Sequence, residues 1–320
     1  MVDLPKLGVE LNDIRAAQTR IAGYVRHTPM VEASPVKEPI AGAQRLFLKL
    51  ENMQISGSFK ARGAVNKLFS LPPEQVKRGI ITASGGNHGL GVAYAGWLAK
   101  SPATIYLSHN APRIKAQKLE GWGAKVVYEG AVWDDANRAA VALAERESLT
   151  YIHPFADPVV IAGQGTLGLE ILADLPEVDV LLVAIGGGGL ISGVSLAVKA
   201  LNPAIKIIGV EPTGAPTLYE SVRAHRLVEL RELTTAANTL APRLSAQINL
   251  DIIQRNVDDI VLVSDDDMRD AAVWLWKEMG IAAELSGAAA LAALLSGKIP
   301  PADRVCALVC GAGTDGIPAS

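Results

Sequence analysis

The chain has 320 residues, of which 49% are hydrophobic, which is enough apolar material for one large domain or two medium ones. Its formal net charge of −3 gives no basic footprint, so we expect no nucleic-acid partner. The two cysteines, Cys306 and Cys310, fit neither a disulfide framework nor a zinc pattern, and they suit a reducing cytoplasm.

Residues 1–10 contain no basic segment followed by an apolar one, so no signal peptide is expected. After them, helical and β-prone patterns alternate, which predicts an α/β fold of parallel sheets with helices on both faces and a ligand beyond the carboxyl ends of the strands. Helices are expected at 11–24, 59–71, 89–100, 113–120, 132–147, 159–172, 268–278 and 286–295, and strands at 45–49, 79–83, 103–107, 125–128, 151–152, 180–185, 205–210, 259–263 and 304–309.

The segment 178–201 is almost wholly apolar and has the length of a membrane-spanning helix. Four consecutive glycines, Gly186 to Gly189, interrupt it. A buried strand, a glycine turn and a helix fit this pattern better than a membrane span, so we expect no membrane partner.

One lysine stands in an unusual setting. Residues 56–64 read SGSFKARGA, in which Lys60 follows an aromatic residue and lies between two glycines. A lysine withdrawn from water has a lowered pKa, and its neutral amine can form a Schiff base with a carbonyl compound. A solvated lysine at a helix start is the alternative, and this segment alone favours it.

Two glycine-rich turns follow predicted strands. The turn Gly186-Gly187-Gly188-Gly189-Leu190 offers bare N–H groups at a helix start and favours phosphate, although it has neither the P-loop lysine nor the spacing of a dinucleotide turn. The alternative is a tight turn that packs a helix on a sheet. The turn 84–88, with sequence SGGNH, could hold a carboxylate or simply cap a helix, and His88 is not expected to act as a base.

The last predicted strand ends in VCGAGTD, which places the Cys310 thiol at the same end of the sheet, although a core cysteine is the more common case. A reactive lysine, a phosphate turn, a carboxylate turn and a weakly polar group at a strand end together match the needs of pyridoxal 5′-phosphate (PLP) and an amino acid substrate.

Five motifs resemble the fold-type II PLP-dependent enzymes, and within them the threonine/serine dehydratase and serine racemase family: SGSFKARGA, ASGGNHGLGVA, IAGQGTLGLE, GGGGL and VCGAGTD. The resemblance spans residues 14–315. It implies a tryptophan synthase β-like fold with PLP in the cleft between two domains. The expected large, PLP-binding domain comprises 1–52 and 155–320, and the expected small, mobile domain comprises 53–154.

The resemblance also implies roles for individual residues. Lys60 and Ser84 would be catalytic. The cofactor would be bound by Phe59, Lys60, Asn87, Gly186, Gly187, Gly188, Gly189, Leu190, Glu284 and Cys310, and the substrate by Ser84, Gly85, Gly86, Asn87 and His88.

This chain departs from the family pattern at two places. Relatives often bind a divalent cation at Glu-x3-Ala-x-Asp, and here Glu211 and Ala215 match but Thr217 replaces the aspartate. The loss of one charged ligand weakens the case for Mg²⁺ or Ca²⁺, and no metal ligand is assigned. Pro242 and Arg243 replace an Asp-Gly pair, which suggests a bulky cation near the cofactor pocket and an altered substrate.

The expected activity is PLP-dependent β-elimination of a β-hydroxy amino acid such as L-threonine or L-serine, giving a 2-oxo acid and ammonium. Racemisation of serine or a related amino acid is an alternative, with the Ser84 hydroxyl returning a proton from the face opposite Lys60. A non-catalytic protein that binds PLP or an amino acid is an alternative of another class. The resemblance further implies a homodimer in the cytoplasm, and up to Ser320 no regulatory domain of the kind found in biosynthetic threonine dehydratases is expected.

Overall fold

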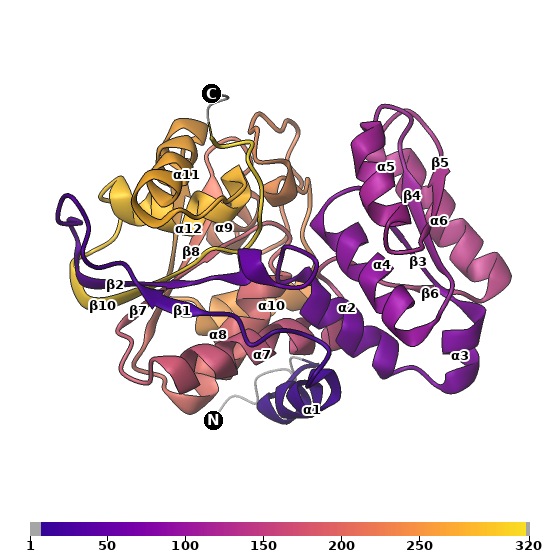
Figure 1. The fold of residues 1–320 in the computed structure, drawn as a ribbon, viewed down its shortest axis with the longest axis horizontal. Helices are drawn as coiled ribbons and strands as arrows, with labels where there is room; N and C mark the ends of the chain where they lie inside the picture. Colours follow the sequence, from indigo (N-terminus) through magenta and orange to yellow (C-terminus); the bar gives the residue numbers. More distant parts are fainter. Residues whose placement is uncertain (1–7, 318–320) are drawn as a thin grey trace.

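A computed structural model describes residues 8–317. Most of residues 1–10, in which no signal peptide is expected, therefore lies outside the described residues. The chain forms two sheets that lie side by side, one parallel and one mostly parallel, each flanked by helices, with the helix α2 (Lys60–Phe69) between them (Figure 1). This is the α/β arrangement that the alternating pattern predicts.

The larger sheet has six strands in the order β1-β2-β10-β7-β8-β9. Strand β1 pairs antiparallel with β2, and the other neighbours are parallel. The last strand in the chain, β10, therefore lies inside the sheet, between β2 and β7. The bounds are β1 (Met30–Glu32), β2 (Ala43–Lys49), β7 (Val180–Ala184), β8 (Lys206–Pro212), β9 (Asp259–Val263) and β10 (Ala302–Leu308).

Helices cover both faces of this sheet (Figure 1). One group is α1 (Leu11–Ile21), α7 (Pro158–Asp174), α8 (Gly189–Leu201) and α10 (Gln247–Asn256), and the other is α9 (Thr217–Arg223), α11 (Asp265–Met279) and α12 (Leu285–Leu295). The strands between them are runs of buried aliphatic residues, as a parallel sheet covered on both faces requires. Local signals set helix starts: the Asp157 carboxylate accepts the N–H groups of Val159 and Val160 at 2.7 and 3.3 Å at the head of α7.

The smaller sheet has four parallel strands in the order β5-β4-β3-β6. Its strands are β3 (Ile80–Ala83), β4 (Ala103–Leu107), β5 (Lys125–Tyr128) and β6 (Thr150–Tyr151), and its helices are α3 (Pro73–Arg78), α4 (Asn87–Ala99), α5 (Arg113–Glu120) and α6 (Trp133–Glu147). Its buried apolar residues form clusters separate from the core of the larger sheet. Each sheet thus has its own core.

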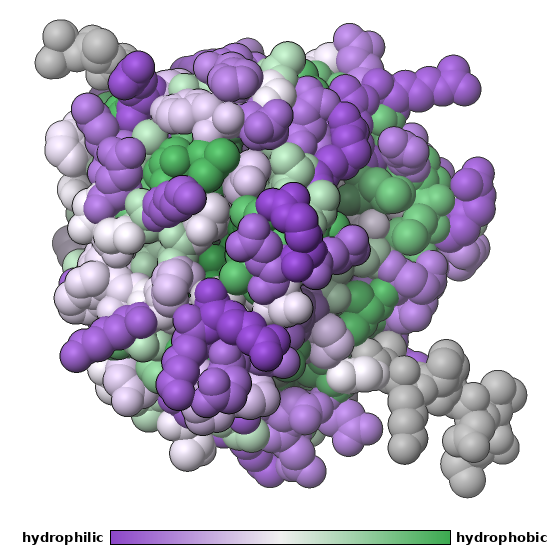
Figure 2. Space-filling view, turned by 90° about the vertical axis from the view of Figure 1, so that its right-hand side faces the viewer, coloured by the Kyte–Doolittle hydropathy of each residue, from purple (hydrophilic) through white to green (hydrophobic). Residues whose placement is uncertain are grey.

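The face that carries the smaller sheet exposes apolar patches among hydrophilic side chains (Figure 2). Its helices hold several exposed large residues, among them Trp97, Ile114 and Trp133. Scattered residues of this kind are ordinary on protein surfaces. The apolar segment 178–201 forms β7, the glycine turn and α8, as expected, and among residues 8–317 no helix has the length and hydropathy of a membrane span.

Candidate active site

The glycine-rich turns lie at the carboxyl ends of strands of both sheets, where a cleft of about 510 Å³ opens between the sheets. Residues from both sides form its wall: Ile55, Ser56, Gly57, Gly85, Gly86, Asn87, Leu90, Lys115, Lys118, Trp122, Glu284, Ala312, Gly313, Thr314 and Asp315. The cleft therefore lies at the predicted end of the strands and is lined by Gly85, Gly86, Asn87 and Glu284, whereas Lys60, Cys310 and Gly186 to Gly189 are not among its lining residues.

Lys60 is the first residue of α2, and its amine donates a hydrogen bond to the Pro154 carbonyl at 2.6 Å. The nitrogen lies 5.1 Å from the centre of the Phe59 ring. Burial lowers the pKa of Lys60 to about 8, an effect that Cys310 opposes slightly. An appreciable fraction of the amine is therefore neutral, and so nucleophilic, near pH 7.

The segment before Lys60 is attached to the end of β10. The N–H of Phe59 donates to the Cys310 carbonyl at 3.4 Å, and the N–H of Ala312 donates to the Gly57 carbonyl at 2.8 Å. The Cys310 thiol donates to the Ser286 carbonyl at 3.4 Å. Burial, reinforced by Glu284, raises the pKa of the Cys310 thiol, so a neutral thiol faces this region.

Gly186 to Gly189 connect β7 to α8, and both interpretations of this turn find support. A side chain on Gly186 would meet the Thr239 carbonyl at 2.8 Å, one on Gly189 would meet the Phe155 carbonyl at 2.9 Å, and Gly188 has φ +92°. Packing alone thus demands glycine. Among the described residues, however, the N–H groups of these glycines have no protein acceptor, which leaves them available for an anion.

The turn after β3 holds the predicted substrate loop. The Ser84 hydroxyl accepts the N–H of Gly86 at 3.3 Å, and the Asn87 amide donates to Glu284 at 2.6 Å. His88 is buried, and its Nε2 donates to the Ile152 carbonyl at 2.9 Å. Burial and the nearby Lys60 lower the pKa of His88 to about 3, so the ring is neutral and only its backbone remains free to bind a substrate.

Glu284 lies at the head of α12 and in the wall of the cleft. Burial raises the pKa of Glu284 to about 7; the hydrogen bond from Asn87 opposes this, and the charge of Asp315 adds to it. The carboxyl group therefore exists in both protonation states near neutral pH.

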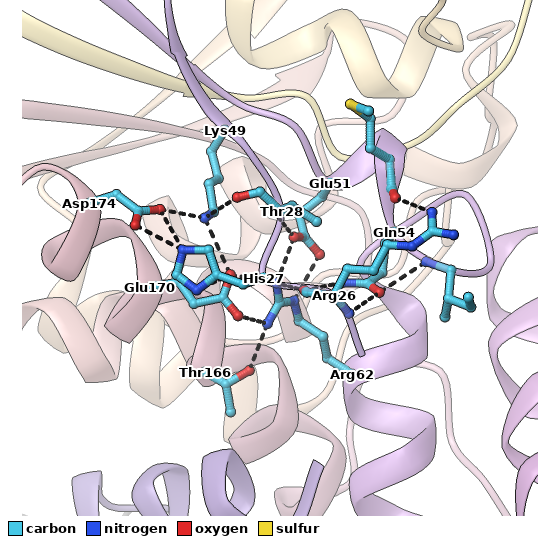
Figure 3. A network of polar contacts seen from close by, with 12 residues as sticks. Arg26, His27, Thr28, Lys49, Glu51, Gln54, Arg62, Thr166, Glu170 and Asp174 are labelled. Carbon is cyan, nitrogen blue, oxygen red and sulfur yellow. Dashed lines mark hydrogen bonds and ion pairs between the residues drawn. The ribbon is translucent and has the colours of Figure 1, made fainter. Parts of the chain in front are cut away.

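Arg62 is a residue of this region to which the sequence analysis gave no role. It is 0% exposed and binds two carboxylates in a forked manner: Glu51 at 2.7 and 2.8 Å and Glu170 at 2.6 and 2.8 Å (Figure 3). Lys49, also 0% exposed, contacts Glu170 at 3.2 Å and Asp174 at 2.8 Å. The cluster joins α2 to β2 and α7.

Further contacts hold α2 against α7. The Asn66 amide donates to the Val159 carbonyl at 2.7 Å, and Lys67 pairs with Asp157 at 2.6 Å. A side chain on Gly63 would come within 2.9 Å of the Val160 carbonyl. The helix that begins with Lys60 is therefore fastened to the helices of the larger sheet.

Glu211, which matches the family's cation pattern, and Arg243, which departs from the family sequence, are not among the residues that line the cleft. Glu211 is fully buried, and its two oxygens accept the N–H groups of Leu218 and Tyr219 at 2.9 and 2.7 Å, so it caps α9. The Arg243 side chain is exposed and donates to the Leu230 and Arg231 carbonyls at 3.3 and 2.7 Å, and the expectation that it lies near the cofactor pocket stays a prediction. In the part of the chain that the structure describes, no group of three or more His, Cys, Asp or Glu residues could hold a metal ion.

The geometry defines a class of protein, namely α/β enzymes in which a reactive amine begins a helix that is attached to the end of one parallel strand, and a turn of unpaired N–H groups follows another. Residues 21–311 match the family model of pyridoxal-phosphate dependent enzymes, and the chain belongs to this family.

Curated and solved relatives agree with this assignment. The chain is 39% identical over 307 residues to the L-threonine ammonia-lyase of Thermotoga maritima, covering 96% of this chain and 76% of that protein. It is 39% identical over 311 residues to the catabolic L-threonine dehydratase TdcB of Staphylococcus aureus, covering 96% and 90%. Among structures, the processed form of threonine deaminase isoform 2 from Solanum lycopersicum has a TM-score of 0.88 at 35% identity, covering 95% of this chain and 83% of that one. The serine racemase of Dictyostelium discoideum has a TM-score of 0.89 at 35% identity, covering 96% and 99%.

The family assignment and the fold confirm the expectation of a fold-type II PLP enzyme. They do not test the roles of single residues or the domain boundaries, which stay predictions.

Proposed function

We propose that this chain is an ammonia-lyase that converts a β-hydroxy amino acid such as L-threonine or L-serine to a 2-oxo acid and ammonium. The observation that carries the proposal is the half-buried Lys60 amine, whose pKa burial lowers to about 8, in a fold that also carries the unpaired glycine turn. Relatives of known name at 39% identity over 96% of the chain support the reaction type.

The residues present fit PLP. The N–H groups of Gly186 to Gly189, at the head of α8, would hold its phosphate together with Leu190, because they have no protein acceptor. Lys60 would be its covalent attachment point, with Phe59 beside the ring. Asn87 would reach the ring hydroxyl, Cys310 the ring nitrogen, and Glu284 would lie near the ring. When bound, PLP supplies an electron sink for the α-carbon of the substrate.

Lys60 would then act as the general base. Its neutral amine takes the α-proton of the substrate, and the Pro154 carbonyl gives the resulting ammonium group an acceptor. The Ser84–His88 turn would bind the substrate carboxylate through backbone N–H groups, the Ser84 hydroxyl and the Asn87 amide. The His88 ring takes no part, because it is buried against the Ile152 carbonyl.

Racemisation is the second candidate. The observation in its favour is the Ser84 hydroxyl in the predicted substrate loop, because this hydroxyl accepts one N–H group of the loop and its own proton stays available for transfer to a substrate. Solved neighbours named as serine racemases, with TM-scores of 0.89, support keeping it. Chiral analysis after incubation with L-serine separates the two: D-serine that forms faster than pyruvate favours racemisation.

We further propose, from the resemblance, a homodimer in the cytoplasm, a large domain at 1–52 and 155–320 and a small mobile domain at 53–154. The separate cores of the two sheets support two domains, although the core of the smaller sheet also includes Ile21 and Val160 from outside 53–154. Crosslinking of the purified protein tests the homodimer, limited proteolysis tests the domain boundaries, and cell fractionation tests the location.

The experiment for the main proposal is incubation of the PLP-loaded protein with L-threonine and L-serine while 2-oxo acid and ammonium are measured. Lys60→Ala should abolish turnover, and borohydride should attach the cofactor to the peptide that contains Lys60. Full activity of that variant, or a label on another peptide, would refute the proposal. Cofactor binding without release of ammonium from any β-hydroxy amino acid would favour the non-catalytic alternative.

A further inference from the structure

The segment 152–156 crosses from the smaller sheet to the larger one and contacts each part of the candidate site. The Pro154 carbonyl accepts the Lys60 amine at 2.6 Å, and the Ile152 carbonyl accepts His88 at 2.9 Å. Phe155 packs on the glycine turn, because its ring lies where a side chain on Gly187 would be. One short stretch of backbone thus connects the lysine, the substrate loop and the phosphate turn.

The side chain of His153 organises this stretch. Its Nδ1 accepts the N–H groups of Phe155 at 3.2 Å and of Ala156 at 2.9 Å, and its ring meets the Phe155 ring edge-on, with centroids 4.7 Å apart. Burial and the charge of Lys60 lower the pKa of His153 to about 4, so the ring is neutral and Nδ1 stays free to accept. The two hydrogen bonds close a turn around Pro154.

We propose that His153 is a positioning residue, whose Nδ1 holds the Pro154 carbonyl against the Lys60 amine and Phe155 against the glycine turn. Without this acceptor, two N–H groups lose their partner and the turn opens. The Pro154 carbonyl then moves away from Lys60, and Phe155 no longer supports Gly187. Both cofactor binding and proton transfer by Lys60 depend on the turn.

An asparagine substitution tests the role of Nδ1 directly. Nδ1 of histidine and Oδ1 of asparagine are both bonded to Cγ, so the two acceptor atoms stand at the same distance along the side chain. Asparagine forms the same kind of turn by accepting N–H groups two and three residues ahead. His153→Asn therefore keeps the acceptor and loses the ring, whereas His153→Phe keeps a ring against Phe155 and loses the acceptor. His109→Phe is the matched control, because His109 is exposed and distant in sequence from the turn.

The readouts are the dissociation constant for PLP, from absorbance titration of the apoprotein, and kcat with L-threonine. His153→Phe should weaken PLP binding and lower kcat by about tenfold or more each, while His153→Asn and His109→Phe stay within about threefold of the parent. If His153→Phe does not fold, His153→Ala replaces it in the comparison. Equal values for the Asn and Phe variants, whether both normal or both impaired, would overturn the inference.

The kcat arm rests on the proposed function, but the PLP titration does not. A parent protein that binds PLP and releases no ammonium would therefore refute the lyase proposal and leave the His153 comparison intact. A difference between the Asn and Phe variants in the PLP titration alone supports the role of His153.

Discussion

Replacing Arg62 by methionine tests how the buried ion cluster holds the lysine helix. Methionine is shorter than arginine but similar in volume, so it fills most of the space and leaves Glu51, 0% exposed, without the forked partner that it contacts at 2.7 and 2.8 Å. Glu170 keeps Lys49 at 3.2 Å, so most of the penalty falls on Glu51.

Removing one partner of a buried ion pair costs about 3–5 kcal/mol, because a charge stays buried without compensation. With a urea dependence of about 3 kcal/mol per molar, the unfolding midpoint of Arg62→Met should fall by about 1–2 M. The assay is urea unfolding of the apoprotein, followed by circular dichroism.

The penalty should depend on pH. In the parent, burial raises the pKa of Glu51, but Arg62 overcomes this effect and holds the pKa below its usual value. The ionised Glu51 therefore stabilises the folded state at pH values above its unfolded pKa, and this contribution is lost as the pH falls through the folded pKa. In Arg62→Met, burial raises the pKa of Glu51 instead, and a proton taken up below neutral pH relieves the unpaired charge. The loss of stability should therefore be larger at pH 8 than at pH 5.5.

Arg45→Met is the matched control, because Arg45 also binds a glutamate, Glu32, with two hydrogen bonds of 2.8 Å but does so at the surface. Solvent screens such a pair, so its removal should change the midpoint little. An Arg62→Met midpoint no lower than that of Arg45→Met, or a penalty that grows as the pH falls, would refute the reasoning.

Three further predictions concern the lysine, the glycine turn and the cap of α9. The rate at which the apoprotein takes up PLP should rise with pH through about 8, because only the neutral Lys60 amine reacts; stopped-flow absorbance measures it, and a rate independent of pH from 6 to 9 would contradict the lowered pKa. Gly187→Ala should cost about 1–3 kcal/mol and weaken PLP binding, since the methyl group meets the Phe155 ring, whereas Gly121→Ala, whose new contacts begin at 3.4 Å, should behave as the parent in the same titration. Burial raises the pKa of Glu211 to about 8, so Glu211→Gln should cost about 1–3 kcal/mol in urea unfolding at pH 9, where the parent carboxylate is ionised and the variant leaves one of two N–H groups at the head of α9 without its acceptor; an unchanged midpoint at this pH would show that the cap is dispensable.

Strong local patterns predicted most of the fold. The bounds of β4, β5, β9 and α5 agree with the expected ranges, since each is a clear apolar or amphipathic run between turn residues. Residues 73–78 lie outside every expected helix, but they form α3, which begins at Pro73 because proline is well suited to a first turn. Strand β1 has three residues and pairs antiparallel with β2, a long-range pairing that no local pattern signals.

The sequence predicts those site residues whose chemistry is visible within a short motif. It does not predict residues whose role depends on partners far away in the sequence. Lys60, the glycine turn and the Ser84–His88 turn stand out because each combines unusual residues within a few positions. Arg62 lies in the same motif as Lys60, yet its partner Glu170 is 108 residues away, so the sequence alone could not pair them. His153 gave no signal, because a histidine that accepts nearby N–H groups resembles any other histidine of a loop.

The place of β10 within the larger sheet bears on the order in which the site can be assembled during synthesis. A growing chain that has reached residue 300 includes the lysine helix and all four strands of the smaller sheet, but it lacks the strand that lies between β2 and β7. It also lacks the Cys310 carbonyl, to which Phe59 binds. The segment before Lys60 can therefore take up its position only after β10 has been made and inserted, and we expect attachment of the vitamin-derived group to follow that step.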